Sequence, residues 1–240
     1  MARALARGWG RPVICSDPVP ERARALAEEL GGEALPTNAE VAERADLVVL
    51  AHKPAQLGAV AAELGPRARA VASILAATPL AALREAYPDR PVYRFLPSLP
   101  NEVRGGAILQ ASDAAARAAV ADQDEQVASL FGELGHLVVL DDGLVDVAMG
   151  LMSCAPAYVA LVVEAQVDAG VRRGIPAAQA AELVVATLAG TAELLSRRGY
   201  DTLAIRREVA SPGGLTARGL DALERGGLRA AFSDALDAVL

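Results

Sequence analysis

The sequence has few of the side chains that usually bind metals or act as nucleophiles. Its 240 residues include only two cysteines, Cys15 and Cys154, and two histidines, His52 and His136. Two distant cysteines argue against a disulfide framework and exclude a C-x-x-C pair. So few thiols and imidazoles also argue against an all-protein zinc site, and we expect no metal.

Long apolar segments and an excess of basic charge are also lacking. No apolar run reaches the ~18–20 residues that cross a bilayer, and the N-terminus has no secretory leader. The formal net charge is −7, and the arginines are scattered along helical patterns rather than gathered in one stripe. We therefore predict a cytoplasmic protein that binds neither membranes nor nucleic acid.

Aromatic residues are scarce at 3%, whereas apolar residues make up 53% of the chain, so the core must consist of Ala, Leu and Val. In the first part of the chain, short apolar runs alternate with helical patterns. This alternation predicts a mostly parallel sheet with helices on its faces. The expected strands are 13–15, 47–51, 71–75, 92–95, 107–110 and 137–140, with helices over 20–30 and 113–134.

The pattern changes after Asp142. From Val145 onward no strand-like run occurs, and long Ala/Leu/Val/Glu stretches are broken at 153–156, 174–176 and 211–214. The sequence therefore predicts an α/β class protein: a Rossmann-like dinucleotide-binding domain over 1–142 and an all-α domain over 143–240.

The chain begins with residues that form a helical pattern, Met1–Gly8. In a doubly wound dinucleotide domain, a strand and the glycines G-x-G-x-x-G/A precede that helix, and an acidic residue follows ~20 residues later. Asp17 lies where this acid is expected if the glycines are just upstream of Met1. We expect an N-terminally truncated domain; the alternative is that residues 1–8 are simply a surface helix.

Polar residues follow three of the expected strands. His52-Lys53-Pro54 follows the second, Ser73 lies in the third, and Arg94-Phe95-Leu96-Pro97 ends the fourth. Ligands of doubly wound folds bind at the carboxyl edge of the sheet, where these ends meet. The alternative is that these residues belong to ordinary loops.

Near the C-terminus, Ser211-Pro212-Gly213-Gly214-Leu215-Thr216 precedes a helical pattern. Two glycines before a helix expose several backbone N–H groups, which is a natural cradle for a carboxylate, and both hydroxyls can take part. The alternative is a glycine-rich turn followed by ordinary helix capping through Thr216. The spacing alone favours the capping interpretation.

Two further groups have an ordinary structural explanation. Cys154, in the small-residue segment 153–158, has no positioned base and is better explained as a structural cysteine than as a nucleophile. Glu164 and Asp168 are one helical turn apart, and a solvated helix face explains them better than a general acid pair.

Several segments together resemble the pyrroline-5-carboxylate reductase family. The most specific is SPGGLTARGLDALERGGLRAAFSDAL at 211–236, which is similar to the C-terminal motif of that family. MARALARG at the start, HKP at 52–54, RFLPSLP at 94–100 and the stretch from Asp146 to Pro176 resemble other family segments. The sequence departs from the family at Ala77, Ser98, Met149 and Ser153.

The resemblance implies hydride transfer from NADPH or NADH to the C=N carbon of 1-pyrroline-5-carboxylate, a cyclic imino acid, giving L-proline. Thr216 is then the catalytic residue that hydrogen-bonds the ring nitrogen, and Ser211, Gly213 and Gly214 hold the carboxylate. Homodimerisation through the helical domain is also implied. The implied cofactor groove comprises Ser16, Asp17, His52, Lys53, Pro54, Ser73, Ala76 and Pro97.

The preferred cofactor and the exact reaction stay open at this point. Asp17 favours NADH by bonding the adenosine ribose, whereas Ser16 favours NADPH by receiving its 2′-phosphate. The rival functions are a related imine or keto-acid reductase and a non-catalytic dimerising paralogue that has lost nucleotide binding.

Overall fold

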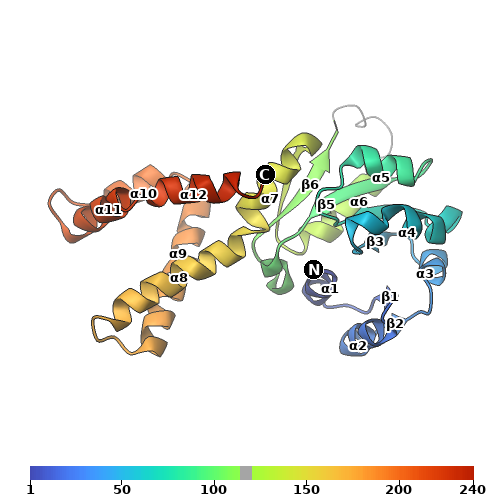
Figure 1. The fold of residues 1–240 in the computed structure, drawn as a ribbon, viewed down its shortest axis with the longest axis horizontal. Helices are drawn as coiled ribbons and strands as arrows, with labels where there is room; N and C mark the ends of the chain where they lie inside the picture. The colour runs from blue at the N-terminus through green and yellow to red at the C-terminus, as the bar shows by residue number, and fades with distance from the viewer. Residues whose placement is uncertain (114–120) are drawn as a thin grey trace. The chain divides into compact units, whose positions relative to one another are not determined.

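A computed structural model describes residues 1–113 and 121–240 of the chain (Figure 1). The chain divides into two compact units, Met1–Pro156 and Ala157–Leu240. The expected helix over 113–134 is described from Ala121 onward, and residues 114–120 of that expectation lie outside the described residues.

The first unit contains a five-stranded sheet in the order β3-β4-β5-β6-β7. Neighbouring strands are parallel except β5 and β6, which are antiparallel. The sheet confirms the expected mostly parallel architecture. The strands are β3 (Val48–Leu50), β4 (Val71–Ser73), β5 (Val92–Leu96), β6 (Ala107–Ser112) and β7 (His136–Asp141).

Two short strands form a separate parallel pair, β1 (Ile14–Cys15) with β2 (Glu33–Ala34). Within the described residues, β1 pairs only with β2, and β3 pairs only with β4. Strands β1 and β3 therefore each keep one edge without a partner strand among the described residues. The strand β2 was not expected, because two residues that include a glutamate produce no apolar run.

Helix α2 begins and ends at the expected signals. Pro20 occupies the first turn of α2, and Gly31, with φ +68°, ends it. The helix at the start is present as α1, and its Leu5 is 1% exposed, so one face of this helix packs into the core. The helices are α1 (Ala2–Trp9), α2 (Pro20–Leu30), α3 (Asn38–Arg44), α4 (Leu57–Leu64), α5 (Leu80–Ala86), α6 (Ala121–Gly132) and α7 (Val145–Met152).

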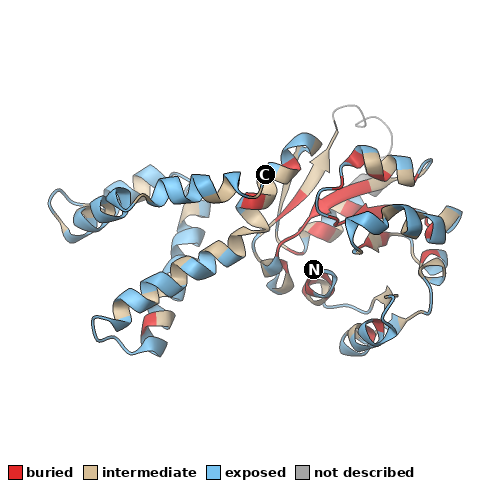
Figure 2. Ribbon diagram, in the orientation of Figure 1, coloured by how far each residue is buried: buried red, intermediate tan, exposed pale blue. Residues whose placement is uncertain are grey.

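The sheet of this unit is the most deeply buried part of the molecule (Figure 2). One cluster packs Leu5 of α1 against the strands, together with Phe95 and Phe131, whose rings stack 3.8 Å apart. A second cluster, which includes Leu83 and Tyr87, packs helices against β3 and β4. Most core residues are aliphatic, as the composition predicts.

The second unit is helical throughout. Residues 157–240 are all described and contain no strand, which confirms the expected all-α region. Its helices are α8 (Ala155–Val171), α9 (Ala177–Arg197), α10 (Thr202–Val209), α11 (Leu215–Arg225) and α12 (Leu228–Asp237), and α8 begins two residues before the unit boundary.

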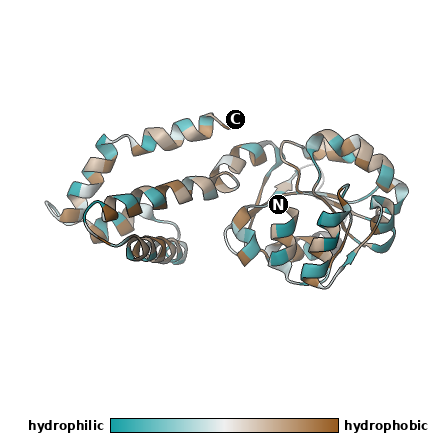
Figure 3. Ribbon diagram, turned by 60° about the horizontal axis from the view of Figure 1, so that its bottom comes forward, coloured by the Kyte–Doolittle hydropathy of each residue, from teal (hydrophilic) through white to brown (hydrophobic). Residues whose placement is uncertain are grey.

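Apolar side chains of the helical unit are left uncovered. Ala180 is the single buried residue among 157–240, whereas Leu161 is 64% exposed and Leu183 is 59% exposed. Figure 3 shows hydrophobic residues along these helices. A helix face of this kind is stable only when another apolar surface covers it.

Two stretches are long and apolar enough to cross a membrane by length and composition, Asp142–Val171 and Ala177–Arg197. The sequence analysis expected no apolar run of that length, whereas here helical segments join shorter apolar runs across charged residues such as Glu164. Length and composition alone are weak grounds for a membrane helix. A helix packed against another protein surface satisfies both.

Candidate active site

The carboxyl ends of three parallel strands are aligned. The register pairs Leu50 of β3 with Ser73 of β4, and Ser73 with Arg94 of β5. The segments that follow these strands therefore leave the sheet at one edge, as the sequence predicted. That edge is where doubly wound folds bind dinucleotides.

The segment after β3 presents a histidine and a lysine. The Nδ1 of His52 lies 2.8 Å from the carbonyl oxygen of Lys53, so Nδ1 carries a proton and donates it to this oxygen. In the part of the chain that the structure describes, this buried Nε2 has no hydrogen-bond partner. Lys53, the only lysine of the sequence, is exposed, and Pro54 begins the short 3-10 helix η1 (Pro54–Gln56).

The segment after β4 makes a tight turn. Ser73 is fully buried, and its Oγ accepts a hydrogen bond from the backbone N–H of Leu75 at 3.2 Å. Ala76 and Ala77 are exposed, and Ala77 has a left-handed backbone with φ +50°. Such a backbone is costly for alanine and favourable for glycine. The departure at Ala77 therefore leaves a strained residue beside the candidate groove.

The loop after β5 is held from inside by Asn101, which sequence reasoning missed. Asn101 is fully buried; its Oδ1 accepts from Ser98 N–H at 2.6 Å, and its Nδ2 donates to Leu134 O at 3.1 Å. Pro97 and Ser98 are buried as well, and Ser98 Oγ donates to Ala107 O at 3.2 Å. Ser98 departs from the family pattern, but its hydrogen bonds still stabilise the loop.

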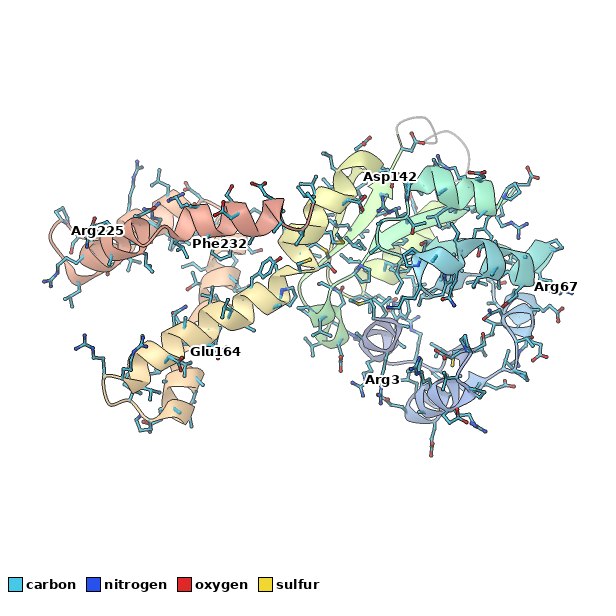
Figure 4. All side chains as sticks on the ribbon, viewed as in Figure 1. Arg3, Arg67, Asp142, Glu164, Arg225 and Phe232 are labelled. Atoms are coloured by element: carbon cyan, nitrogen blue, oxygen red, sulfur yellow. The ribbon has the colours of Figure 1, made fainter. Side chains whose placement is uncertain are left out.

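Arg94 makes a buried ion-pair network. It is 1% exposed and donates from Nη1 to Asp142 Oδ1 at 2.8 Å and from Nη2 to Asp146 Oδ1 at 2.7 Å. The other oxygen of Asp142 (labelled in Figure 4) accepts the N–H of Leu80, the first residue of α5, at 3.0 Å. This network ties the end of β5 to the starts of α5 and α7. Its carboxylates lie about 50 residues away along the chain, so no local pattern predicts it.

Ser16 and Asp17 follow β1, where another polar group collects. Ser16 Oγ donates to Asn38 Oδ1 at 2.6 Å, and Asn38 Nδ2 donates to Glu63. Asp17 Oδ1 accepts from Val19 N–H at 2.8 Å. Burial, and then the Asp17 carboxylate, raise the pKa of the neighbouring Cys15 thiol. Asn38 was not among the predicted site residues, because only the fold brings it to Ser16.

The loop before α11 is a hydrogen-bonded turn. The carbonyl of Ser211 accepts from Gly214 N–H at 3.0 Å, with Pro212 and Gly213 between them and Gly213 at φ +69°. Proline followed by a positive-φ glycine is the signature of a type II turn. A Cβ at Gly214 would collide with Ser211 Oγ. Both glycines are therefore required by the backbone.

The capping interpretation of Thr216 is wrong. Helix α11 begins at Leu215 with Gly214 as its N-cap, and no side chain caps it. Thr216 is the second helical residue and is exposed. The first N–H groups of a helix have no partner within it, so the N–H groups of 215–217 and two free hydroxyls lie at one helix end. This arrangement suits a small carboxylate.

Glu164, Asp168 and Cys154 do not form a catalytic arrangement among the described residues. Glu164 (labelled in Figure 4) and Asp168 are both exposed on α8, in keeping with a solvated helix face. Cys154 is half-buried. The predicted cofactor residues all belong to unit Met1–Pro156, and the predicted substrate residues all belong to unit Ala157–Leu240.

Comparisons with known proteins cover both parts of the chain. Residues 142–240 match the family model for pyrroline-5-carboxylate reductase dimerisation, and residues 1–77 match that for coenzyme F420-dependent NADP oxidoreductase. A pyrroline-5-carboxylate reductase of Thermus thermophilus is 37% identical over 98% of this chain and 88% of its own length. One of Synechocystis is 34% identical over 99% of this chain and 90% of its own length.

Solved structures show the same fold. The 1-pyrroline-5-carboxylate reductase of Streptococcus pyogenes superposes with a TM-score of 0.88 at 28% identity, over all of this chain and 92% of that one. The pyrroline carboxylate reductase of Plasmodium falciparum, solved with NADP bound, has a TM-score of 0.85 at 24% identity, over 98% of this chain and 90% of that one.

The Rossmann-like sheet edge and the all-α region define a nicotinamide-dependent oxidoreductase of the two-domain class. Within that class, the identities over nearly the whole chain place it in one family. The chain belongs to the pyrroline-5-carboxylate reductase family.

Proposed function

We propose that this chain reduces the C=N bond of 1-pyrroline-5-carboxylate to L-proline with NADPH or NADH. The observation that carries the proposal is the Ser211–Gly214 turn, which ends at exposed helical N–H groups with Thr216 beside them. Membership of the reductase family supports the choice of substrate.

The substrate carboxylate is held by the backbone amides at the start of α11. The N–H groups of 215–217 face no intrahelical partner, and the positive end of the helix dipole favours a negative charge there. Ser211 Oγ lies against Gly214, so its hydroxyl belongs to the same cradle.

Thr216 holds the ring nitrogen. Its hydroxyl is exposed and is not used for capping, so it is available to hydrogen-bond the imine and support its protonation. A protonated imine accepts hydride readily, so positioning supplies most of the rate enhancement. A histidine-centred catalytic group is therefore not required.

The cofactor groove lies along the ends of β1, β3, β4 and β5. When bound, a reduced nicotinamide supplies the hydride. Lys53 is exposed beside the sheet edge and is positioned to attract the phosphates. The other residues that we assign to this groove are Ser16, Asp17, His52, Pro54, Ser73, Ala76 and Pro97.

A second copy of the chain covers the exposed apolar helices. The dimerisation family model spans 142–240, the same residues whose leucines and valines lie uncovered. This assignment favours a homodimeric, cytoplasmic enzyme over a membrane protein. We place the boundary between the nucleotide domain (1–142) and the dimerisation and substrate domain (143–240), although α7 packs against β6 of the sheet.

The test is oxidation of NADH and NADPH, followed by absorbance, with 1-pyrroline-5-carboxylate and a panel of other cyclic imines and keto acids. The 240-residue chain is assayed beside a form that carries a strand and a G-x-G-x-x-A loop ahead of Met1, because β1 and β3 each have an unpaired edge. Fastest turnover of pyrroline-5-carboxylate by either form supports the proposal. Faster turnover of another substrate indicates a related reductase, and two folded but inactive forms indicate a non-catalytic paralogue.

A further inference from the structure

The polar group after β1 consists of hydrogen-bond acceptors. The hydroxyl proton of Ser16 is already donated to Asn38 Oδ1 at 2.6 Å. A hydroxyl that has used its proton offers only its lone pairs to a ligand. In this arrangement Ser16 accepts a hydrogen bond from a ligand and does not donate one.

Glu63 fixes the orientation of the Asn38 amide. The Nδ2 of Asn38 donates to the Glu63 carboxylate, which is an acceptor only. If the amide were turned over, its oxygen would face that carboxylate, and both would be acceptors. In this arrangement Ser16 faces the oxygen of Asn38, which takes up its hydroxyl proton.

Asp17 adds a negative charge next to Ser16. One of its oxygens accepts from Val19 N–H at 2.8 Å, and the residue is half-buried. Burial raises the pKa of the Cys15 thiol, and this carboxylate raises it further. The group of Ser16, Asp17, Asn38 and Glu63 therefore carries two carboxylates, those of Asp17 and Glu63.

Most of the described arginines of this unit are engaged in ion pairs, and Lys53, at the end of β3, is assigned to the cofactor phosphates rather than to this group. Three arginines of this unit are paired with carboxylates: Arg24 with Glu21, Arg44 with Glu33 and Arg67 with Glu43. Among the described residues of α2, Arg22 alone of the arginines has no ion pair, and it is exposed. A 2′-phosphate would need several donors or cations, whereas a ribose 2′-hydroxyl needs an acceptor.

We propose that the residues after β1 select NADH over NADPH, with the Asp17 carboxylate and Ser16 Oγ accepting hydrogen bonds from the adenosine ribose. This inference rests on the proposed function, because it assumes that a nicotinamide dinucleotide binds along the sheet edge. It specifies which of the two cofactors this chain takes.

The test measures the dissociation constants of NADH and NADPH for the 240-residue chain by the change in nucleotide fluorescence, without substrate. We expect NADH to bind at least about tenfold more tightly at low salt, the size expected for one uncompensated like charge near a phosphate. Raising the salt concentration should narrow the ratio by improving NADPH binding, because the repulsion is screened within ~10 Å at 0.1 M salt.

Two variants localise the effect. Asp17→Ser removes the charge but keeps an acceptor for Val19 N–H, and it should bring the ratio of the two dissociation constants towards one. Glu63→Gln lets the Asn38 amide turn over and frees the Ser16 hydroxyl, and it should also improve NADPH binding. The matched control is Glu28→Gln, which removes one charge from an exposed position on the same helix as Arg22 and should leave the ratio unchanged.

Equal or tighter binding of NADPH by the parent chain would overturn the inference. So would a ratio that Asp17→Ser leaves unchanged, or NADPH binding that Arg22→Ala abolishes, since Arg22 would then hold the phosphate. If imine reduction is observed with NADPH preferred, the inference fails and the proposed function stands. If neither nucleotide binds to the 240-residue chain or to the form extended ahead of Met1, both fail.

Discussion

At the scale of single residues, the backbone conformation determines which residue type fits at Ala77 and Gly213. Ala77 has φ +50° in the turn after β4, which is a conformation that glycine adopts without strain. Gly213, with φ +69°, occupies a turn position that demands such a residue. The first position carries strain in this chain, whereas the second does not.

The strain at Ala77 leads to a stability prediction. Ala77→Gly should raise the free energy of unfolding by about 1 kcal/mol, because the Cβ that opposes the left-handed backbone is removed. The measurement is urea denaturation. Ala76→Gly is the control, since its φ is not positive, and it should leave stability unchanged or lower it. Equal effects of the two substitutions would contradict the strain argument.

Thr216 is the residue on which the proposed chemistry depends most. Thr216→Ala should lower turnover about 100-fold, because the imine nitrogen loses its hydrogen-bond partner. Thr216→Ser keeps the hydroxyl and should keep most of the activity. Both variants should show the circular dichroism of the parent, because Thr216 is exposed and caps nothing. A Thr216→Ala protein as active as the parent would refute the role.

At the scale of elements, sequence patterns located most strands and helices. Apolar runs revealed β1, β3, β4, β5, β6 and β7, and the breakers at Pro20 and Gly31 marked both ends of α2. The antiparallel entry of β6 could not be predicted, because apolar periodicity carries no strand direction. The strand β2 escaped because it has two residues and no apolar run.

The sequence predicted those parts of the candidate site that consist of neighbouring residues. The turn at Ser211–Gly214 and the segments after β3 and β4 were visible in the sequence. The contacts of Asn38 with Ser16, and of Arg94 with Asp142, join residues that are distant along the chain. Such pairs depend on the register of the sheet and on helix packing, and no spacing rule indicates them.

The Arg94 network makes an element-scale prediction. Asp142→Ala should lower the free energy of unfolding by about 3 kcal/mol. The substitution removes one of the two carboxylates that pair with the Arg94 guanidinium, which is only 1% exposed, and it leaves the N–H of Leu80 without its acceptor. Asp46→Ala removes a partner from an exposed ion pair with Arg69 and should cost less than about 1 kcal/mol. Thermal denaturation of both variants measures the difference, and similar costs would contradict the anchoring role.

At the scale of the whole molecule, the helical unit cannot be stable with its apolar faces in water. Leu183 on α9 is 59% exposed and Leu161 on α8 is 64% exposed, in a unit with a single buried residue. Burial of such side chains contributes about 25 cal/mol per Å². In the function that we propose, assembly with a second copy supplies the missing core.

Sedimentation velocity should therefore show a dimer or a larger assembly of the 24.7 kDa chain. Leu183→Glu places a charge on the covered face and should weaken assembly at least about tenfold. The control is Glu182→Gln on the same helix, which should leave assembly intact. A parent chain that sediments as a monomer would contradict the assignment of this surface.

The most direct test of the central claim follows the hydride itself. The protein is incubated with 1-pyrroline-5-carboxylate and NADH deuterated at the transferring position, and the product is analysed by mass spectrometry and nuclear magnetic resonance. The account predicts L-proline with one deuterium at the former imine carbon. Proline without deuterium, or no proline from a folded protein in either N-terminal form, would contradict it.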